Sequence, residues 1–445
     1  MNVQELRDAL HDRADHVADI GAPARIAATH ERVVVVRRRR RAGVVAAVAT
    51  AVIAVVTAGA LSLLPDRPQV QPAEHHTPAK LAGYRVDPRV SFSGWDFRYA
   101  QGVQSARGQQ QLVLDLPSSK EQRIFGWGVR ASGFSDRTAT LRLDGVVVDH
   151  TGPATWTSGD VLSAGRPHHL VVSFRKHSPG NRAGVAVYDL AGTAPAGVTN
   201  GATTFRSTIA GDTLVGAHLG RSGQSRVAFE VTVPSTRLRF STSCAGAPTH
   251  DMVELSVNGQ PLGSSSCDPL PDLDPGASGA SRGPQGWDGS LGIHPGATLH
   301  LTLRLLGRHD RPTTVPGVVL GGGVYRLAAP VARVAGWDVP ALVEGPGGTY
   351  RYQRSAQSRP GQARLTLHLA AASQRRLVNY GTSHVRGEVD VVIDGRSDDG
   401  VQGGGSSYAG GPVLSPGRPH TVTLVVRRGL TPRSVLGIVI SRRQG

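Results

Sequence analysis

Three aromatic residues recur at one place in a repeated sequence pattern: Trp156, Trp287 and Tyr408. Each stands nine residues before a glycine of a predicted turn, at Gly165, Gly296 and Gly417. An aromatic ring in a loop before a strand could stack on a sugar ring, as in carbohydrate-binding modules. Such a ring more often fills the open end of a β-sandwich core. We favour the core role for these three residues and keep ligand stacking as the alternative.

The chain has two cysteines, Cys244 and Cys267, on either side of a predicted tight turn at Asn258-Gly259. Strands joined by that turn could bring the two thiols together across neighbouring strands or loops. Outside the membrane a disulfide is the expected state, and the chain-entropy estimate for such a loop is roughly 3 kcal/mol of stabilisation. Two cysteines are too few for a structural zinc site, so we predict a disulfide in the second module.

Other polar clusters are weaker indications of a functional site. Three aspartates follow the second cysteine: Asp268, Asp272 and Asp274. They could hold Ca²⁺, but their spacing matches no known calcium loop, which favours a solvated acidic loop. His168-His169 and His420 recur at one place and indicate a turn-to-strand junction. Because the sequence has no Gly-x-Ser-x-Gly elbow, His-Glu-x-x-His pair or phosphate-binding loop, we predict no catalytic residue, no metal ligand, no cofactor and no enzymatic activity.

The elements that would position these residues repeat three times. Each copy has a strand that ends in a hairpin signal: Asp144-Gly145, Asn258-Gly259 and Asp394-Gly395. These dipeptides suit two-residue hairpins because both central positions need φ > 0. A glycine turn then precedes an alternating strand, and in residues 299–305 the four leucines would face the core. We therefore predict a mainly β fold with three tandem β-sandwich or jelly-roll-like modules, at residues 84–205, 206–332 and 333–445.

A segment typical of a membrane anchor precedes the modules. Residues 42–64 hold no charge over 23 positions, which as a transmembrane helix would rise about 35 Å and cross a hydrocarbon core of about 30 Å. Five arginines precede this segment: Arg37, Arg38, Arg39, Arg40 and Arg41. Basic flanks stay cytoplasmic, so we expect a single-pass cell-membrane protein with a cytoplasmic N-terminus and an extracellular C-terminal region. A cleaved signal peptide is the alternative, although residues 1–41 are long for its basic region.

Residues 1–41 form a predicted cytoplasmic leader that contains an amphipathic helix at 2–20. Asn2 and Glu5 match a capping box. Apolar residues follow steps of three and four along one face: Val3, Leu6, Leu10, Ala14, Val17 and Ile20. This stripe would need a partner, either another protein or the bilayer surface, and a disordered leader is the alternative. Residues 65–83 contain four prolines and form a predicted linker.

The leader carries a resemblance to a known group of proteins. Its sequence Met1-Asn2-Val3-Gln4-Glu5-Leu6-Arg7-Asp8-Ala9-Leu10-His11-Asp12-Arg13-Ala14, followed by the arginine cluster and the Ala/Val-rich span, resembles the leader of actinobacterial single-pass membrane proteins. Some of these are encoded beside extracytoplasmic-function sigma factors, and the resemblance implies a membrane-tethered regulator. It covers residues 1–64 only. The chain departs from zinc-binding anti-sigma domains because no cysteine precedes Cys244, so their His/Cys zinc cluster cannot form.

Charge and organisation leave three functional hypotheses. The net charge is +16, but outside the arginine cluster no more than two basic residues are consecutive, which favours a dispersed solvated surface over attraction to anionic polymers. We first expect a non-catalytic protein that touches the lipid bilayer and whose exported modules bind or scaffold envelope glycan or protein, with no nucleic-acid partner. The second hypothesis is a transmembrane signalling regulator whose cytoplasmic helix binds a sigma factor or similar regulatory protein. The third is an envelope enzyme without a recognisable motif.

Overall fold

The computed structural model describes residues 80–444 apart from 93, 132–137, 152–153, 249, 269–272, 278–279, 282–290, 346–347 and 403–404. The predicted leader, membrane span and most of the predicted linker lie outside these residues. The described part is mainly β-structure, with 3-10 turns at Pro275–Ala277 and Arg308–Asp310 and no α-helix. In this part of the chain, no helix is long and apolar enough to cross a bilayer.

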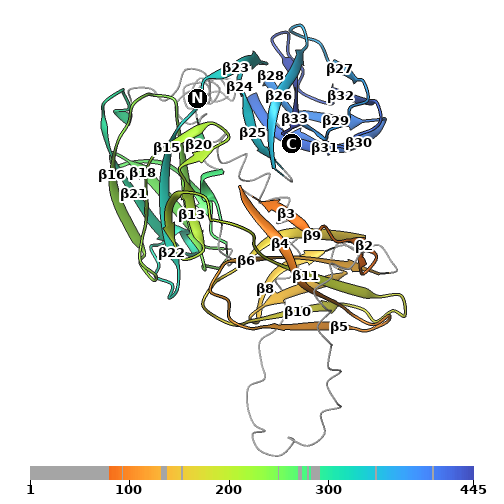
Figure 1. The fold of residues 1–445 in the computed structure, drawn as a ribbon. Coiled ribbons are helices and arrows are strands. Elements are labelled where there is room, and N and C mark those ends of the chain that lie inside the picture. The colour runs from red at the N-terminus through yellow and green to blue at the C-terminus, as the bar shows by residue number, and fades with distance from the viewer. Residues whose placement is uncertain are drawn as a thin grey trace, which may run out of the picture. The chain divides into compact units, whose positions relative to one another are not determined.

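The described strands repeat in three runs of eleven, which we name the first, second and third copies (Figure 1). The first copy holds β1 (Lys80–Leu81), β2 (Tyr84–Arg85), β3 (Arg89–Phe92), β4 (Trp95–Gln104), β5 (Gln111–Leu116), β6 (Arg123–Arg130), β7 (Ala139–Leu143), β8 (Val146–Thr151), β9 (Ala154–Leu162), β10 (His168–Phe174) and β11 (Arg182–Leu190). The second holds β12 (Gly197–Asn200), β13 (Thr203–Arg206), β14 (Thr208–Ile209), β15 (Asp212–Leu219), β16 (Arg226–Thr232), β17 (Leu238–Ala245), β18 (Met252–Val257), β19 (Gln260–Ser266), β20 (Ala280–Ser281), β21 (Thr298–Leu306) and β22 (Val319–Arg326). The third holds β23 (Pro330–Val334), β24 (Trp337–Pro340), β25 (Leu342–Gly345), β26 (Gly348–Gln357), β27 (Arg364–Leu369), β28 (Arg376–Val385), β29 (Glu388–Ile393), β30 (Arg396–Gln402), β31 (Gly405–Leu414), β32 (His420–Val426) and β33 (Val435–Arg443).

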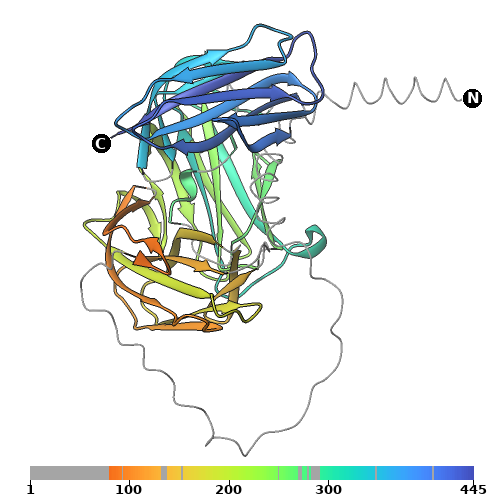
Figure 2. The same cartoon turned by 90° about the vertical axis from the view of Figure 1, so that its right-hand side faces the viewer.

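Each copy builds a four-stranded and a five-stranded antiparallel sheet. The orders in the first copy are β5-β10-β7-β8 and β3-β4-β11-β6-β9. They become β16-β21-β18-β19 and β14-β15-β22-β17-β20 in the second copy, and β27-β32-β29-β30 and β25-β26-β33-β28-β31 in the third. Every label shifts by eleven from one copy to the next, so the three copies share one topology. Figure 2 shows the strands of each copy from a second direction.

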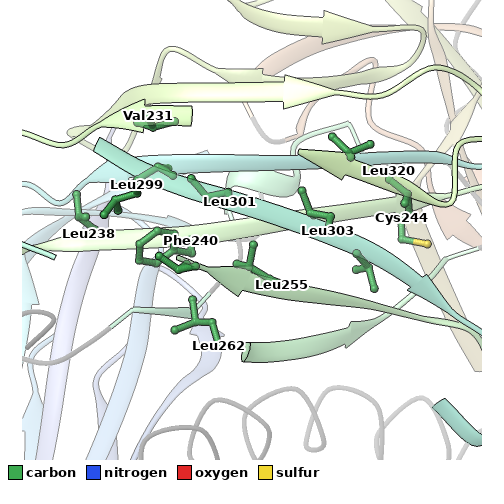
Figure 3. Close-up of a cluster of buried hydrophobic side chains, with 14 of the residues drawn as sticks. Val231, Leu238, Phe240, Cys244, Leu255, Leu262, Leu299, Leu301, Leu303 and Leu320 are labelled. Carbon is green, nitrogen blue, oxygen red and sulfur yellow. The ribbon is translucent and has the colours of Figure 1, made fainter. Parts of the chain in front are cut away.

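The core of the second copy lies between its two sheets (Figure 3). Four leucines of β21 alternate into this core and are at most 1 % exposed: Leu299, Leu301, Leu303 and Leu305. Phe240 from β17 and Leu255 from β18 pack in the same cluster. The predicted alternation of β21 is confirmed, since His300 and Arg304 between the leucines are exposed.

The five-stranded sheets are buried on both faces at their centre. Their central strands β11, β22 and β33 each contain six consecutive buried residues. A short hairpin covers the second face: Phe205 of β13 packs with Tyr325 of β22, and Val334 of β23 packs with Val439 of β33. In the first copy, Leu81 of β1 lies so close to Gly184 of β11 that a Cβ on this glycine would approach Leu81 Cβ to 3.0 Å. The four-stranded sheets keep one exposed face.

The predicted Asp-Gly and Asn-Gly hairpins are confirmed in all three copies. They join β7 to β8, β18 to β19 and β29 to β30. Both central residues of each turn have positive φ, between 51° and 84°. This backbone matches the twist of the flanking strands, which explains why these dipeptides recur at the turns.

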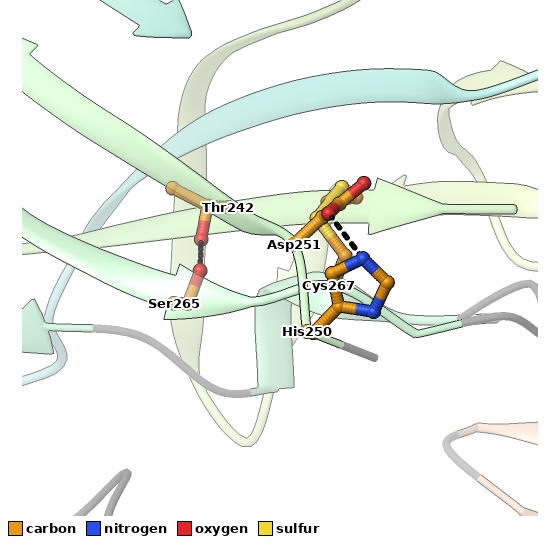
Figure 4. The surroundings of a disulfide bond; sticks show 6 residues. Thr242, His250, Asp251, Ser265 and Cys267 are labelled. Atoms are coloured by element: carbon orange, nitrogen blue, oxygen red, sulfur yellow. Dashed lines mark hydrogen bonds and ion pairs between the residues drawn. A yellow bond between two sulfur atoms is a disulfide. The ribbon is translucent and has the colours of Figure 1, made fainter. Parts of the chain in front are cut away.

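The predicted disulfide between Cys244 and Cys267 is present (Figure 4). Cys244 lies in β17 of the five-stranded sheet, and Cys267 directly follows β19 of the four-stranded sheet. Hydrogen bonds surround the bond, because Asp268 N donates to Cys244 O at 3.0 Å and Cys267 N donates to Asp251 O at 2.9 Å. The disulfide therefore ties the two sheets of the second copy together beside their shared core.

The described residues divide into two compact units. One holds residues 80–90 and 97–191, and the other holds residues 91–96 and 192–444. Hairpin β12–β13 belongs to the second of these units and packs on the second copy through Phe205, although the sequence places residues 197–205 at the end of the first module. Strand β1 likewise lies within the segment predicted as linker.

Candidate functional site

The recurring histidines lie at a junction between a hairpin turn and a strand, as predicted. In the first copy, His168 Nδ1 lies 2.9 Å from Asp144 Oδ2, and its Nε2 lies 2.9 Å from Ser163 O. In the third copy, His420 Nδ1 lies 2.8 Å from Asp394 Oδ2 and its Nε2 lies 2.9 Å from Ser415 O. Both rings are buried. The first and third copies thus hold their histidines in the same geometry, although the two junctions lie far apart in the sequence.

These histidines are not arranged for catalysis. A backbone carbonyl only accepts hydrogen bonds, so Nε2 of His168 and of His420 must donate. The other ring nitrogen faces a carboxylate, so neither ring presents a lone pair to a substrate or a nucleophile. A serine–histidine–aspartate triad needs Nε2 beside a hydroxyl oxygen, whereas here Nε2 meets the carbonyl oxygen of the serine. The junction is a structural link between turn and strand.

The aspartate of the third-copy junction holds three groups at once. Asp394 Oδ1 accepts from Thr421 N at 2.9 Å, and Oδ2 also lies 3.3 Å from Arg418 Nη2. The hydrogen bond from the Thr421 amide, followed by the contacts with His420 and Arg418, holds the pKa of Asp394 below its usual value. The carboxyl is therefore most strongly tied to the fold when ionised.

The second copy makes the junction without an acid or a buried histidine. Asn258 replaces the aspartate, and its Oδ1 accepts from His300 N at 2.9 Å. Its Nδ2 donates to Leu291 O at 2.8 Å. The side-chain amide of Asn258 thus supplies the hydrogen bond to a backbone carbonyl that the buried histidine supplies in the other two copies. The fold therefore tolerates Asn in place of Asp at this turn.

Two of the three repeated aromatics lie in strands, and their predicted place in a loop is wrong. Trp156 lies in β9 opposite Gly128, and Tyr408 lies in β31 opposite Gly381. Each of the two strands is an edge strand of the five-stranded sheet of its own copy, at the equivalent position in the strand order. Trp287 lies outside the described residues. The choice between core filling and ligand stacking stays a prediction.

The prediction of a solvated acidic loop after Cys267 is wrong for Asp274. It is 3 % exposed, and its Oδ2 accepts from Arg206 Nε at 2.8 Å. A buried carboxylate needs such a partner, because burying a lone charge is costly. Asp272 lies outside the described residues, and among the described ones no three His, Cys, Asp or Glu residues gather to hold a metal ion.

The surface left open to a ligand is the outer face of each four-stranded sheet. It carries cross-strand polar pairs: His169 with Asp115, His300 with Glu230, and His368 with Thr421. Hydroxyl pairs extend it, at 3.1 Å for both Thr232–Thr298 and Thr366–Thr423. The alternation in residues 299–305 predicts this outward face in the second copy. The cross-strand pairs on the faces were not predicted, because each pair joins strands that are distant in the sequence.

Comparison with known proteins assigns no family. No family model matches the chain, and no curated protein matches it. Solved structures overlap weakly. A chain in the crystal structure of the plant peptide RALF23 in complex with FER and LLG2 matches at 11 % identity and a TM-score of 0.19, over 78 % of this chain and 82 % of that one. The ANX1 ectodomain from Arabidopsis thaliana matches at 10 % identity and a TM-score of 0.17, over 78 % of this chain and 83 % of that one. The CUB1-EGF-CUB2 domains of rat MASP-1 match at 10 % identity and a TM-score of 0.16, over 50 % of this chain and 96 % of that one. At such TM-scores these neighbours carry no argument about this chain.

Proposed function

We propose that this chain is a non-catalytic single-pass membrane protein whose exported β-sandwich modules bind or scaffold at the cell envelope. The two sheets of each copy, with their shared strand order, suit a jelly-roll sandwich. The uncharged run at 42–64 would anchor the chain, and the arginines at 37–41 would keep its N-terminus in the cytoplasm. A disulfide between Cys244 and Cys267 fits an oxidising compartment outside the membrane.

One observation carries the binding proposal: the same open polar sheet face occurs in all three copies. In the second and third copies a hairpin packs on the outer face of the five-stranded sheet at its central strand, so the outer face of the four-stranded sheet is the uncovered polar face that all three copies share. Three similar weak sites on one chain raise overall affinity for a repeating polymer through effective concentration. An envelope polymer is such a ligand.

Co-sedimentation with purified, protein-free envelope polymer tests this proposal on the full chain in detergent micelles. We expect the chain to pellet with the polymer, and a variant with His169→Ala, His300→Ala and His368→Ala to pellet less. The matched control changes three exposed loop histidines: His177→Ala, His250→Ala and His294→Ala. Failure of the unmodified chain to pellet, or equal loss in both variants, would contradict binding through the outer faces.

A further inference from the structure

Three arginines stand in register at one end of the five-stranded sheet of the third copy. Arg351 in β26 pairs with Arg442 in β33, and Arg442 pairs with Arg376 in β28. Opposed residues of antiparallel strands project from the same face and have Cα atoms about 5 Å apart. The arginine row, Arg351–Arg442–Arg376, therefore spans about 10 Å of one sheet face.

The row lies where the core-facing side of this sheet reaches solvent. Ile438 and Ile440 precede Arg442 by four and two residues, and both are buried in the core of the third copy. Residues two apart in a strand share a face. Arg351 and Arg442 are exposed, whereas Arg376 is only 9 % exposed. The row thus leads from the surface to the edge of the core.

No acid pairs with the arginine row in the described part of the chain. Arg376 Nη1 donates to Ala370 O at 2.6 Å, and its buried Nε has no hydrogen-bond partner among the described residues. Arg351 donates from Nε and Nη2 to the Gln444 side-chain oxygen at 2.9 and 3.0 Å, in the amide orientation that these donors require. Both acceptors are neutral, so no described residue compensates the three positive charges of the row.

The carboxylate of Glu344 lies two residue pairs from Arg351 along the sheet edge but is engaged elsewhere. Thr349 Oγ1 donates to Glu344 Oε1 at 3.3 Å, and Arg206 Nη2 lies 3.6 Å from the same oxygen. On the neighbouring positions, Arg375 and Arg443 add further positive charge. Burial raises the pKa of Tyr350, and these two arginines act in the opposite direction. The end of the sheet is therefore strongly positive.

The equivalent row in the first copy has a different charge. There Asp189 of β11 stands between Arg98 of β4 and Arg123 of β6, so an acid separates the two arginines. Arg123 makes the bond that Arg376 makes, from Nη2 to Pro117 O at 2.6 Å. The second copy has Thr213, Arg326 and Leu238 in these places. Three adjacent arginines occur in this row in the third copy alone among the three.

We propose that the arginine row binds the phosphate groups of an anionic polymer. Guanidinium groups match phosphate oxygens in a planar, two-bond geometry. One carboxylate would leave two charges of the row unpaired, whereas a phosphate-bearing polymer brings several charges and many acceptor oxygens. The choice of polymer over free phosphate rests on the proposed function, and the phosphate chemistry rests on the row itself. The third copy then selects phosphate-bearing envelope polymers among the ligands of the modules.

Calorimetric titration of the full chain in neutral detergent with short-chain polyphosphate tests the site. Arg442→Asp restores the charge pattern of the first copy, so the sheet should accommodate it. We expect it to weaken binding about tenfold or more, because a hydrogen bond to a charged group is lost and a repulsion is added. The control Arg433→Asp makes the same charge change in the exposed loop that precedes β33 of the same copy, at the opposite end of that strand from Arg442, and should leave affinity within about twofold. Equal losses in both variants would show only a net-charge effect and overturn the site.

Two further variants keep the test decisive. Arg351→Gln removes one exposed member of the row without introducing an acid and should also weaken binding, even if Arg442→Asp fails to fold. Asp189→Arg completes an arginine row in the first copy and should raise the number of bound polyphosphates per chain. Unchanged affinity in Arg351→Gln together with unchanged stoichiometry in Asp189→Arg would refute the proposal.

Parallel titrations separate the sources of phosphate and the two proposals. Inorganic phosphate and phosphatidylglycerol in the same micelles should bind more weakly than polyphosphate, and tighter binding of either would overturn the polymer assignment. Envelope polymer stripped of phosphate should lose its contact with the row. If retention on stripped polymer equals retention on intact polymer, the row is refuted while the proposed function stands. If polyphosphate binds but no envelope polymer is retained, the site stands as a phosphate site and the proposed function fails.

Discussion

At the residue scale, single polar side chains decide how the turns are held. Asp394 binds the Thr421 amide, the His420 ring and Arg418. At the equivalent turn of the second copy, the side-chain amide of Asn258 donates to the Leu291 carbonyl instead. The carboxylate adds a dependence on pH that the amide lacks. A carboxyl whose pKa is lower in the folded chain than in the unfolded chain stabilises the fold above its unfolded pKa, and this contribution is lost as the pH falls through the folded pKa.

We predict that Asp394→Asn makes the third copy less sensitive to acid. The pKa of Asp394 is lowered from 3.8, so the unmodified copy should lose stability as the pH falls below that value. The variant should be less stable at neutral pH and lose less on acidification. Hydrogen exchange of residues 420–426 at pH 6 and at pH 3 measures this, with the Asn258 turn of the second copy as the internal control. The same acid dependence in both proteins would contradict the assignment.

The repeated aromatics give a second prediction at this scale. If Trp156, Trp287 and Tyr408 fill the cores, changing one to alanine should destabilise its own copy by about 3–5 kcal/mol. We expect this for at least two of the three, measured by thermal and denaturant unfolding. Unchanged unfolding of all three variants would refute the core role, and a simultaneous loss of glycan retention would establish ligand stacking.

At the element scale, the covering hairpins depend on glycines in the strands beneath them. A Cβ added to Gly437 of β33 would lie 2.5 Å from Val334 Cγ1 of β23. We predict that Gly437→Ala destabilises the third copy by about 1–3 kcal/mol, because a packed interface resists extra volume. Gly263→Ala in β19 is the matched control, since nothing lies within 4 Å of its added Cβ. Equal unfolding midpoints of the two variants would show that the hairpin does not pack there.

Sequence reasoning finds the elements whose local chemistry is explicit. The Asp-Gly and Asn-Gly turns, the alternation of β21 and the Cys244–Cys267 bond all follow from residue type and spacing. The covering hairpins of the first and third copies were missed, because their turns place Ala82 and Ala335 at φ of 50° and 48°, a conformation that alanine rarely adopts. The edge position of Trp156 and the arginine row were also missed. Both depend on the register of strands distant in sequence, which no local pattern encodes.

At the scale of the whole molecule, the account depends on where the chain lies. The arginines at 37–41 predict that everything from residue 65 onward is outside the membrane. A periplasm-dependent reporter fused after residue 84 should be active, and the same reporter fused after Arg32 should be inactive. The reverse pattern would contradict the orientation. A mature N-terminus near Leu61 in membrane-extracted protein would instead identify a cleaved signal peptide.

The most direct test of the central claim is detergent extraction of cells that produce the chain. Detergent dissolves the bilayer and leaves the wall polymer as an insoluble residue. The account predicts that the full chain stays with this residue after its membrane is gone, whereas a chain that ends after residue 79 is released. Immunodetection of an epitope at the N-terminus in the soluble and insoluble fractions gives the measurement. Release of the full chain together with the lipids would contradict the proposal that its exported modules bind the envelope.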